Sequence, residues 1–100
     1  MKSSEIWTSI LEDRKTKLVA MKKEQEELER KYDVMSYEED MYYYLAQRHS
    51  KYKNIFEKKQ TSSDEAMKQV YNEKEKLFEK IKLLNMEIEY IEERLPSFTK

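Results

Sequence analysis

An apolar repeat in the C-terminal half constrains the fold of this chain more than any other feature. From residue 67 onward, alternating steps of three and four fall on nine positions, of which eight are apolar: Met67, Val70, Lys74, Leu77, Ile81, Leu84, Ile88, Ile91 and Leu95. This is the a/d pattern of a helix that packs along its whole length against another helix. A capping signal at Ser62-Ser63-Asp64-Glu65 and a stop signal at Pro96 predict that this helix spans residues 64–95.

The N-terminal segment carries a similar repeat. Seven of nine positions are apolar in the series Trp7, Leu11, Arg14, Leu18, Met21, Gln25, Leu28, Tyr32 and Met35. The phase then changes, because the best apolar series after residue 35 runs through Tyr37, Met41 and Leu45. Either one helix spans residues 4–59 with a stutter near Ser36, or the helix breaks there into two. Since no Gly, Pro or Asn lies nearby, we favour one long helix.

The polar residues 60–63 provide the clearest turn between the two repeats. The predicted fold is therefore all-α, an antiparallel helical hairpin or coiled coil that forms a single domain over residues 1–100. It has a long first helix, a turn at residues 59–64, a second helix over 64–95 and a short tail over 96–100. A break near Ser36 would instead give a self-contained three-helix bundle.

Several kinds of chemistry are excluded by what the chain lacks. It has no Gly and no Cys, so it cannot form a phosphate-binding glycine loop, a thiolate metal site or a cysteine nucleophile. The single histidine, His49, lies among cations, without the carboxylate that would orient a catalytic imidazole. A di-metal helical bundle would need repeated Glu-x-x-His motifs, which one histidine cannot supply. We expect no enzymatic activity, no metal, no cofactor and no small-molecule substrate.

The unequal lengths of the two predicted helices suggest a partner interface. If the turn lies at residues 59–64, the first thirty residues overhang the second helix with their apolar stripe uncovered. We expect a helical protein or a second copy to cover this stripe, in a heterodimer or homodimer, through Trp7, Ile10, Leu11, Leu18, Met21 and Leu28. The cluster Tyr42-Tyr43-Tyr44 cannot face one side of a helix, so Tyr42 and Tyr43 are further candidates for docking.

Nucleic acid and membrane-spanning roles receive little support. Residues 36–60 interleave aromatic and basic side chains, but they carry five positive and four negative charges, which is not a basic patch. No apolar run approaches the roughly 20 residues that span a bilayer. The N-terminus also lacks the uncharged apolar stretch of a signal peptide. We expect a cytoplasmic protein, and export without a cleaved signal stays open.

The chain resembles the small helical accessory partners of Leu-x-Gly toxins of type VII secretion. The resemblance rests on Ile6-Trp7 near the start, on the Gly-poor helical hairpin, and on the heptad-rich segment from Asn72 to Leu95. It implies a fold similar to that of the Trp-x-Gly family and a partner in the helical N-terminal domain of a secreted toxin. The chain departs from the family motifs, because Thr8-Ser9 follows Trp7 and the tyrosine-to-acid spacing of Tyr71 and Glu75 lies inside a predicted helix.

The sequence therefore favours a non-enzymatic adaptor or targeting chaperone that binds a helical partner. Two alternatives remain. One is a self-assembling structural coiled coil of the phage-scaffold type, and the other is a phage-encoded inhibitor protein.

Overall fold

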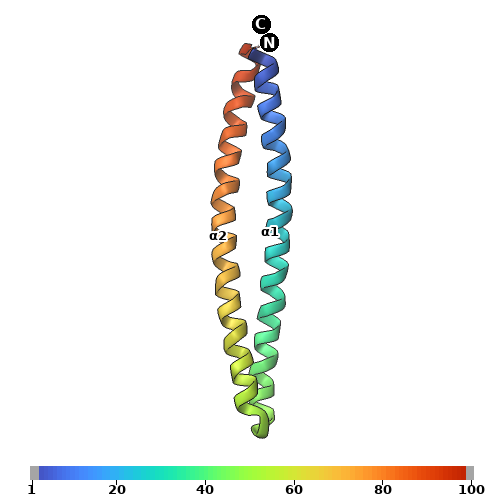
Figure 1. Ribbon diagram of the computed structural model, residues 1–100, viewed down its shortest axis with the longest axis vertical. Coiled ribbons are helices and arrows are strands. Elements are labelled where there is room, and N and C mark those ends of the chain that lie inside the picture. Colours follow the sequence, from blue (N-terminus) through green and yellow to red (C-terminus); the bar gives the residue numbers. More distant parts are fainter. Residues whose placement is uncertain (1–2, 99–100) are drawn as a thin grey trace. The chain divides into compact units, whose positions relative to one another are not determined.

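The computed structural model describes residues 3–98, which form an antiparallel hairpin of two helices. Helix α1 spans Ser3–Arg48, a short 3-10 turn η1 spans Ser50–Tyr52, and helix α2 spans Lys53–Phe98 (Figure 1). Both α-helices have 46 residues, and residues 3–98 contain no strand. The expected all-α hairpin is confirmed.

The predicted position of the turn, at residues 59–64, is wrong. Helix α2 continues through these residues, and the Thr61 hydroxyl donates a hydrogen bond to the Glu57 carbonyl at 3.0 Å, as it can inside a helix. The core register extends backward from Met67 through three residues that are all half-buried, namely Ser63, Gln60 and Phe56. Packing of this face outweighs the modest helix propensities of serine and threonine.

The true turn uses no glycine and no unusual backbone. His49, with φ −120° and ψ 81°, leaves the helical region, and its carbonyl accepts a hydrogen bond from the Tyr52 N–H at 2.9 Å. No residue in the described range 3–98 has a positive φ. Ala46 is only 2% exposed, and its small side chain lets the two helices approach closely beside the turn. A chain without glycine can therefore reverse direction here.

Helix α1 does not break at Ser36, so the three-helix alternative is wrong, and the helix ends at Arg48 rather than at residue 59. The half-buried or buried positions continue from Met35 through Glu39 and Tyr42 to Ala46 in unchanged register. Tyr37, in contrast, is 77% exposed. The phase change in the sequence reflects a second apolar series on the outer surface of α1, and not a stutter in its core.

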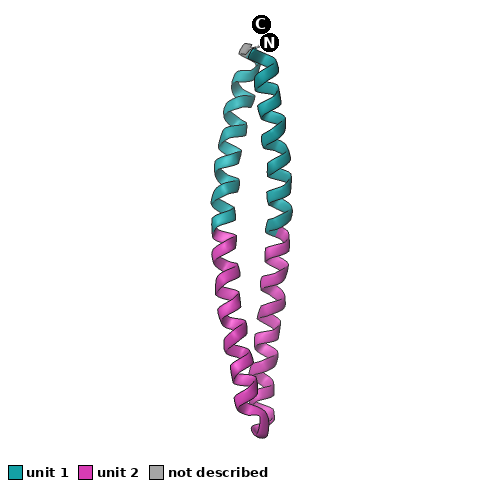
Figure 2. Ribbon diagram, viewed as in Figure 1, with its two compact units in different colours: residues 1–25, 76–100 teal, residues 26–75 magenta. Residues whose placement is uncertain are grey.

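The chain divides into two compact units (Figure 2). In unit 1, residues 3–25 of α1 pair with residues 76–98 of α2. Its buried cluster consists of Leu11, Leu84, Ile88 and Ile91, with Trp7, Ile10, Leu18, Met21 and Leu95 packed against it. The predicted overhang is therefore wrong, because the start of α1 packs on the end of α2. The α2 spine expected from the heptads is confirmed, since all five of its residues are buried: Leu77, Ile81, Leu84, Ile88 and Ile91.

Unit 2, residues 26–75, contains the turn and has a more polar interface between its helical segments. Its buried apolar residues are Leu28, Ala46 and Val70. Polar side chains occupy other half-buried core positions: Glu39, Gln60, Ser63 and Lys74. Ring contacts supplement the packing, with Tyr42 stacked on Phe56 at 6.4 Å between centroids and the Lys74 ammonium 5.1 Å from the centre of the Tyr32 ring.

The predicted end of the second helix at residue 95 is also corrected. Helix α2 includes Pro96 and ends at Phe98. The fixed φ of proline is compatible with a helix, and in the last turn its missing N–H removes only one hydrogen bond. Of the predicted tail over 96–100, residues 99–100 lie outside the described part of the chain.

Candidate functional site

An apolar groove lies between the two helical segments of unit 1. It has a volume of about 430 Å³ and is lined by Trp7, Ile10 and Arg14 of α1 and by Met86, Glu87, Tyr90 and Ile91 of α2. The polar lining residues pair with each other, since Arg14 Nε lies 3.4 Å from Glu87 Oε2. The groove therefore offers a mostly apolar surface with one ion pair on it.

Aromatic contacts hold the side chains of the groove in place. The Trp7 and Tyr90 rings are 6.2 Å apart between centroids with their planes tilted by 56°. The Arg94 guanidinium lies 4.1 Å from the centre of the Tyr90 ring. Such tilted aromatic pairs and cation–π contacts each contribute roughly 0.5–1.5 kcal/mol beyond the burial of area. The groove wall is thus formed by contacts within unit 1.

The apolar surface extends beyond the lining residues along both helices. Ile6 lies one turn before Ile10, and Leu83 lies three residues before Met86, so each shares a helix face with a lining residue. Ile6 is 45% exposed and Leu83 is 59% exposed. The groove is therefore the centre of a larger apolar surface that two helices provide together.

Charged side chains flank this surface. Lys15 Nζ lies 3.2 Å from Glu92 Oε1, which adds a second ion pair between α1 and α2. On α1, hydrogen bonds from Lys17 and Arg14 hold the pKa of the Asp13 carboxyl below its usual value. These pairs are exposed, so each contributes little to stability. Both positive and negative side chains therefore lie beside the groove.

The sequence-predicted interface residues fall into different environments. Leu11 and Leu28 are buried, while Leu18 and Met21 pack against the core of unit 1. The structure brings Trp7 and Ile10 together in the groove. In unit 2, Tyr42 is half-buried against Phe56, whereas Tyr43 is 57% exposed.

Sequence reasoning missed the α2 side of the groove. Met86 and Tyr90 lie outside the a/d repeat, so the repeat does not predict their place in the groove. The signal was present in the sequence, because Leu83, Met86 and Tyr90 follow steps of three and four and so form a second apolar series on α2.

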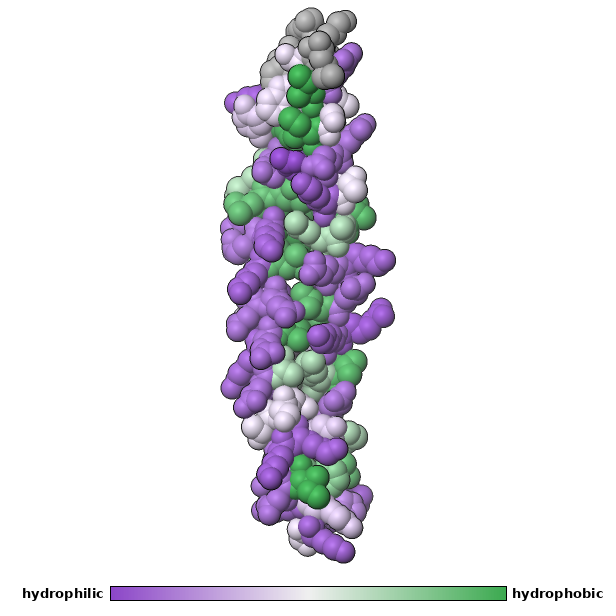
Figure 3. All heavy atoms as spheres, in the orientation of Figure 1, coloured by the Kyte–Doolittle hydropathy of each residue, from purple (hydrophilic) through white to green (hydrophobic). Residues whose placement is uncertain are grey.

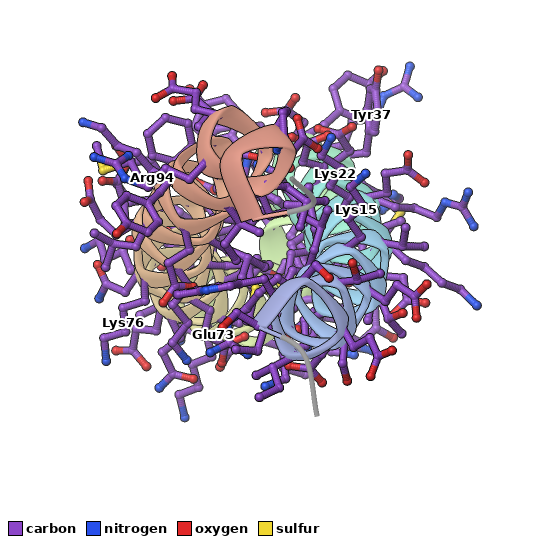
Figure 4. All side chains as sticks on the ribbon, turned by 90° about the horizontal axis from the view of Figure 1, so that it is seen from above. Lys15, Lys22, Tyr37, Glu73, Lys76 and Arg94 are labelled. Carbon is purple, nitrogen blue, oxygen red and sulfur yellow. The ribbon has the colours of Figure 1, made fainter. Side chains whose placement is uncertain are left out.

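Unit 2 carries a comparable series on the outer face of α1. It consists of four exposed residues at steps of three and four: Val34, Tyr37, Met41 and Tyr44. Tyr37 points away from both helices (Figure 4). In the space-filling view, apolar residues form patches that are separated by charged side chains (Figure 3). On the face shown, the apolar surface is therefore divided into separate patches.

Polar and acidic side chains gather around a second hollow, in unit 2. A hollow of about 530 Å³ is lined by Glu39, Glu57, Gln60, Thr61 and Asp64. Within the described range, no three His, Cys, Asp or Glu side chains lie close enough to hold a metal ion. Glu75 accepts a hydrogen bond from the Tyr71 hydroxyl, which raises the pKa of Tyr71. Both residues lie inside α2, as expected from the sequence. His49 is exposed at the turn.

Comparisons with known proteins leave the family open. No protein-family model matches the chain, and no curated protein or solved structure matches it significantly. Neither α1 nor α2, over their described residues, contains a stretch apolar enough to cross a membrane.

Proposed function

We propose that this chain is a non-enzymatic interaction module that binds an amphipathic helix of a protein partner over the groove of unit 1. The observation that carries the proposal is the groove itself, in which two helices expose apolar side chains on both sides of a shared hollow. A third helix with apolar residues at steps of three and four would fill this hollow as one more member of a bundle.

The size of the surface is consistent with a specific complex. Full burial of a large apolar side chain contributes roughly 1.5–3 kcal/mol. Met86, Tyr90, Leu83 and Ile6 are each about half exposed, so each would contribute about half of that value. Trp7 adds an aromatic anchor of the type that is enriched at interface hot spots.

The biological role that we propose is that of an accessory or targeting partner for a secreted Leu-x-Gly toxin, with the helical N-terminal domain of the toxin as the bound helix. Its support is the resemblance of the sequence to such accessory proteins, together with the hairpin fold and the position of Trp7 in the groove. A phage-encoded inhibitor would use the same surface on another target.

A second candidate function is self-assembly, in which the groove of one copy packs on that of another. The separate apolar series on the outer face of α1 favours this reading, because it offers a second surface for growth beyond a dimer.

The test is a pair of methionine substitutions, Met86→Glu in the groove and Met41→Glu on the outer face of α1. Both methionines are about half exposed, so neither change should unfold the hairpin. The probe is the helical N-terminal domain of a Leu-x-Gly toxin. Trp7, the only tryptophan, lies in the groove and should report binding by a change in its fluorescence.

We expect Met86→Glu to abolish binding and Met41→Glu to preserve it. If both variants bind as well as the wild type, the groove is not the docking site. Sedimentation of the wild type alone tests the second candidate. A stable oligomer that Met86→Glu dissociates would favour self-assembly over a foreign helix.

A further inference from the structure

The turn end of unit 2 concentrates positive charge in a chain that is nearly neutral overall. Residues 43–59, which we call the basic tip, contain five basic residues and one acidic residue, a net charge of +4. The whole chain has a net charge of −1, so the remaining residues carry −5. Because the turn lies at η1, the residues before and after it lie side by side, and the positive charges gather at one end of the unit.

The basic tip contains the longest exposed stretch of unit 2. All nine residues from 47 to 55 are exposed, and η1 has no buried residue. The cations within this stretch are Arg48, Lys51 and Lys53, and Lys58 and Lys59 follow on α2. Glu57 pairs with Lys53 at 3.8 Å and neutralises only one of them.

Exposed amphipathic side chains accompany these cations. Tyr44 and Tyr52 are each about half exposed, and so is the apolar side chain of Ile55. The Arg48 guanidinium lies 5.1 Å from the centre of the Tyr44 ring, and the Lys51 ammonium lies 5.6 Å from that of Tyr52. Tyrosine with lysine or arginine is the combination that prefers the boundary between lipid headgroups and acyl chains.

We propose that the basic tip docks on an anionic phospholipid surface. Each basic residue near such a surface strengthens binding about fivefold, so several together give reversible peripheral association. Tyr52 and Ile55 would enter the headgroup region while the lysines contact phosphates and carboxylates. No residue of the basic tip lines the groove of unit 1, so this proposal is independent of the proposed function.

A nucleic acid fits these observations less well than a membrane. Proteins that bind single strands follow the backbone along a positively charged groove and stack bases on open aromatic faces. In the basic tip, the cations surround an exposed turn, and cations already lie over one face of the Tyr44 and Tyr52 rings. A flat anionic surface needs neither a groove nor a free ring face.

The experiment measures co-sedimentation of the full chain with vesicles of phosphatidylcholine, with and without phosphatidylserine. The test variant is Lys51→Glu/Lys53→Glu. The matched control, Lys80→Glu/Lys82→Glu, changes the net charge equally at two exposed lysines of unit 1 with the same spacing. Circular dichroism checks that each variant is folded.

We expect the wild type and the control to bind only the vesicles that contain phosphatidylserine, and more weakly as salt is raised. The tip variant should bind at least roughly 25-fold more weakly, since two favourable charges are lost. The proposal is overturned if the wild type ignores anionic vesicles at low salt, or if both variants lose binding equally. It is also overturned if a single-stranded oligonucleotide displaces the protein from vesicles through the same lysines, which would assign the basic tip to nucleic acid.

Discussion

Replacement of Ser62 by proline should destabilise the hairpin by about 3 kcal/mol or more, because Ser62 lies in the interior of α2. Proline removes the N–H that an interior helical residue donates four residues back, and its ring clashes with the preceding turn. The Ser62 side chain is exposed, so the change removes no packing and isolates the backbone effect.

Ser50→Pro is the matched control. Ser50 is the first residue of η1, and proline is favoured at the first position of a helix. The preceding residue, His49, has φ −120° and ψ 81°, which is outside the α region that a following proline disfavours. We expect this variant to be as stable as the wild type, or to gain up to about 1 kcal/mol from a less flexible unfolded chain.

The assay is thermal unfolding followed by circular dichroism. For a domain of this size, 3 kcal/mol corresponds to a fall in Tm of roughly 12–24 °C. A turn at residues 59–64 would give the opposite result, with Ser62→Pro tolerated and Ser50→Pro damaging. That pattern would refute the assignment of the turn to η1, and with it the pairing of the two chain ends in unit 1.

Two further predictions concern unit 1. Leu84→Ala should lower the free energy of unfolding by about 2–5 kcal/mol, since Leu84 is 6% exposed and belongs to the buried cluster. Leu83→Ala should change it little, because Leu83 is 59% exposed. Similar melting temperatures for the two variants would contradict the assigned core face. The hydrogen bond from Lys17 is the main reason that the pKa of Asp13 is lowered in the folded protein. The ion pairs of Asp13 therefore stabilise the fold at any pH above the ordinary carboxyl pKa. This stabilisation is lost as the pH falls through the lower pKa of the folded state. The difference in stability between the wild type and Asp13→Asn should therefore shrink in acid, and an NMR titration that finds an ordinary or raised Asp13 pKa would oppose this reasoning.

Hydrophobic periodicity predicts the fold class and the buried core of unit 1. The α2 spine from Leu77 to Ile91 is apolar at every core position, so its buried face follows directly from helical geometry. The same reasoning failed in unit 2, where Glu39, Gln60 and Ser63 occupy core positions. There these polar residues interrupt the apolar core series, while the outer series through Tyr37 and Met41 is apolar. A search for apolar steps therefore selects the wrong face after residue 35.

The candidate site could be predicted only in part, because it depends on which helical segments face each other. The expected overhang predicts that Trp7 and Ile10 contact a partner, whereas the structure places them in a groove whose other wall is α2. Met86 and Tyr90 enter that wall only once residues 76–98 lie beside the start of α1. A single helix face is visible in a sequence, whereas a groove between two faces requires their register.

That register was available from a simple physical condition. In a chain without glycine, helix propagation through a few polar residues costs little, whereas thirty residues of uncovered apolar stripe would forgo several kcal/mol of burial. The favoured hairpin is therefore the one in which the two stripes cover each other completely. The stripes run from Trp7 to Leu95, and the midpoint of these positions is Lys51, the central residue of η1. Burial of both stripes together, and not the local polarity of residues 60–63, determines where this chain turns.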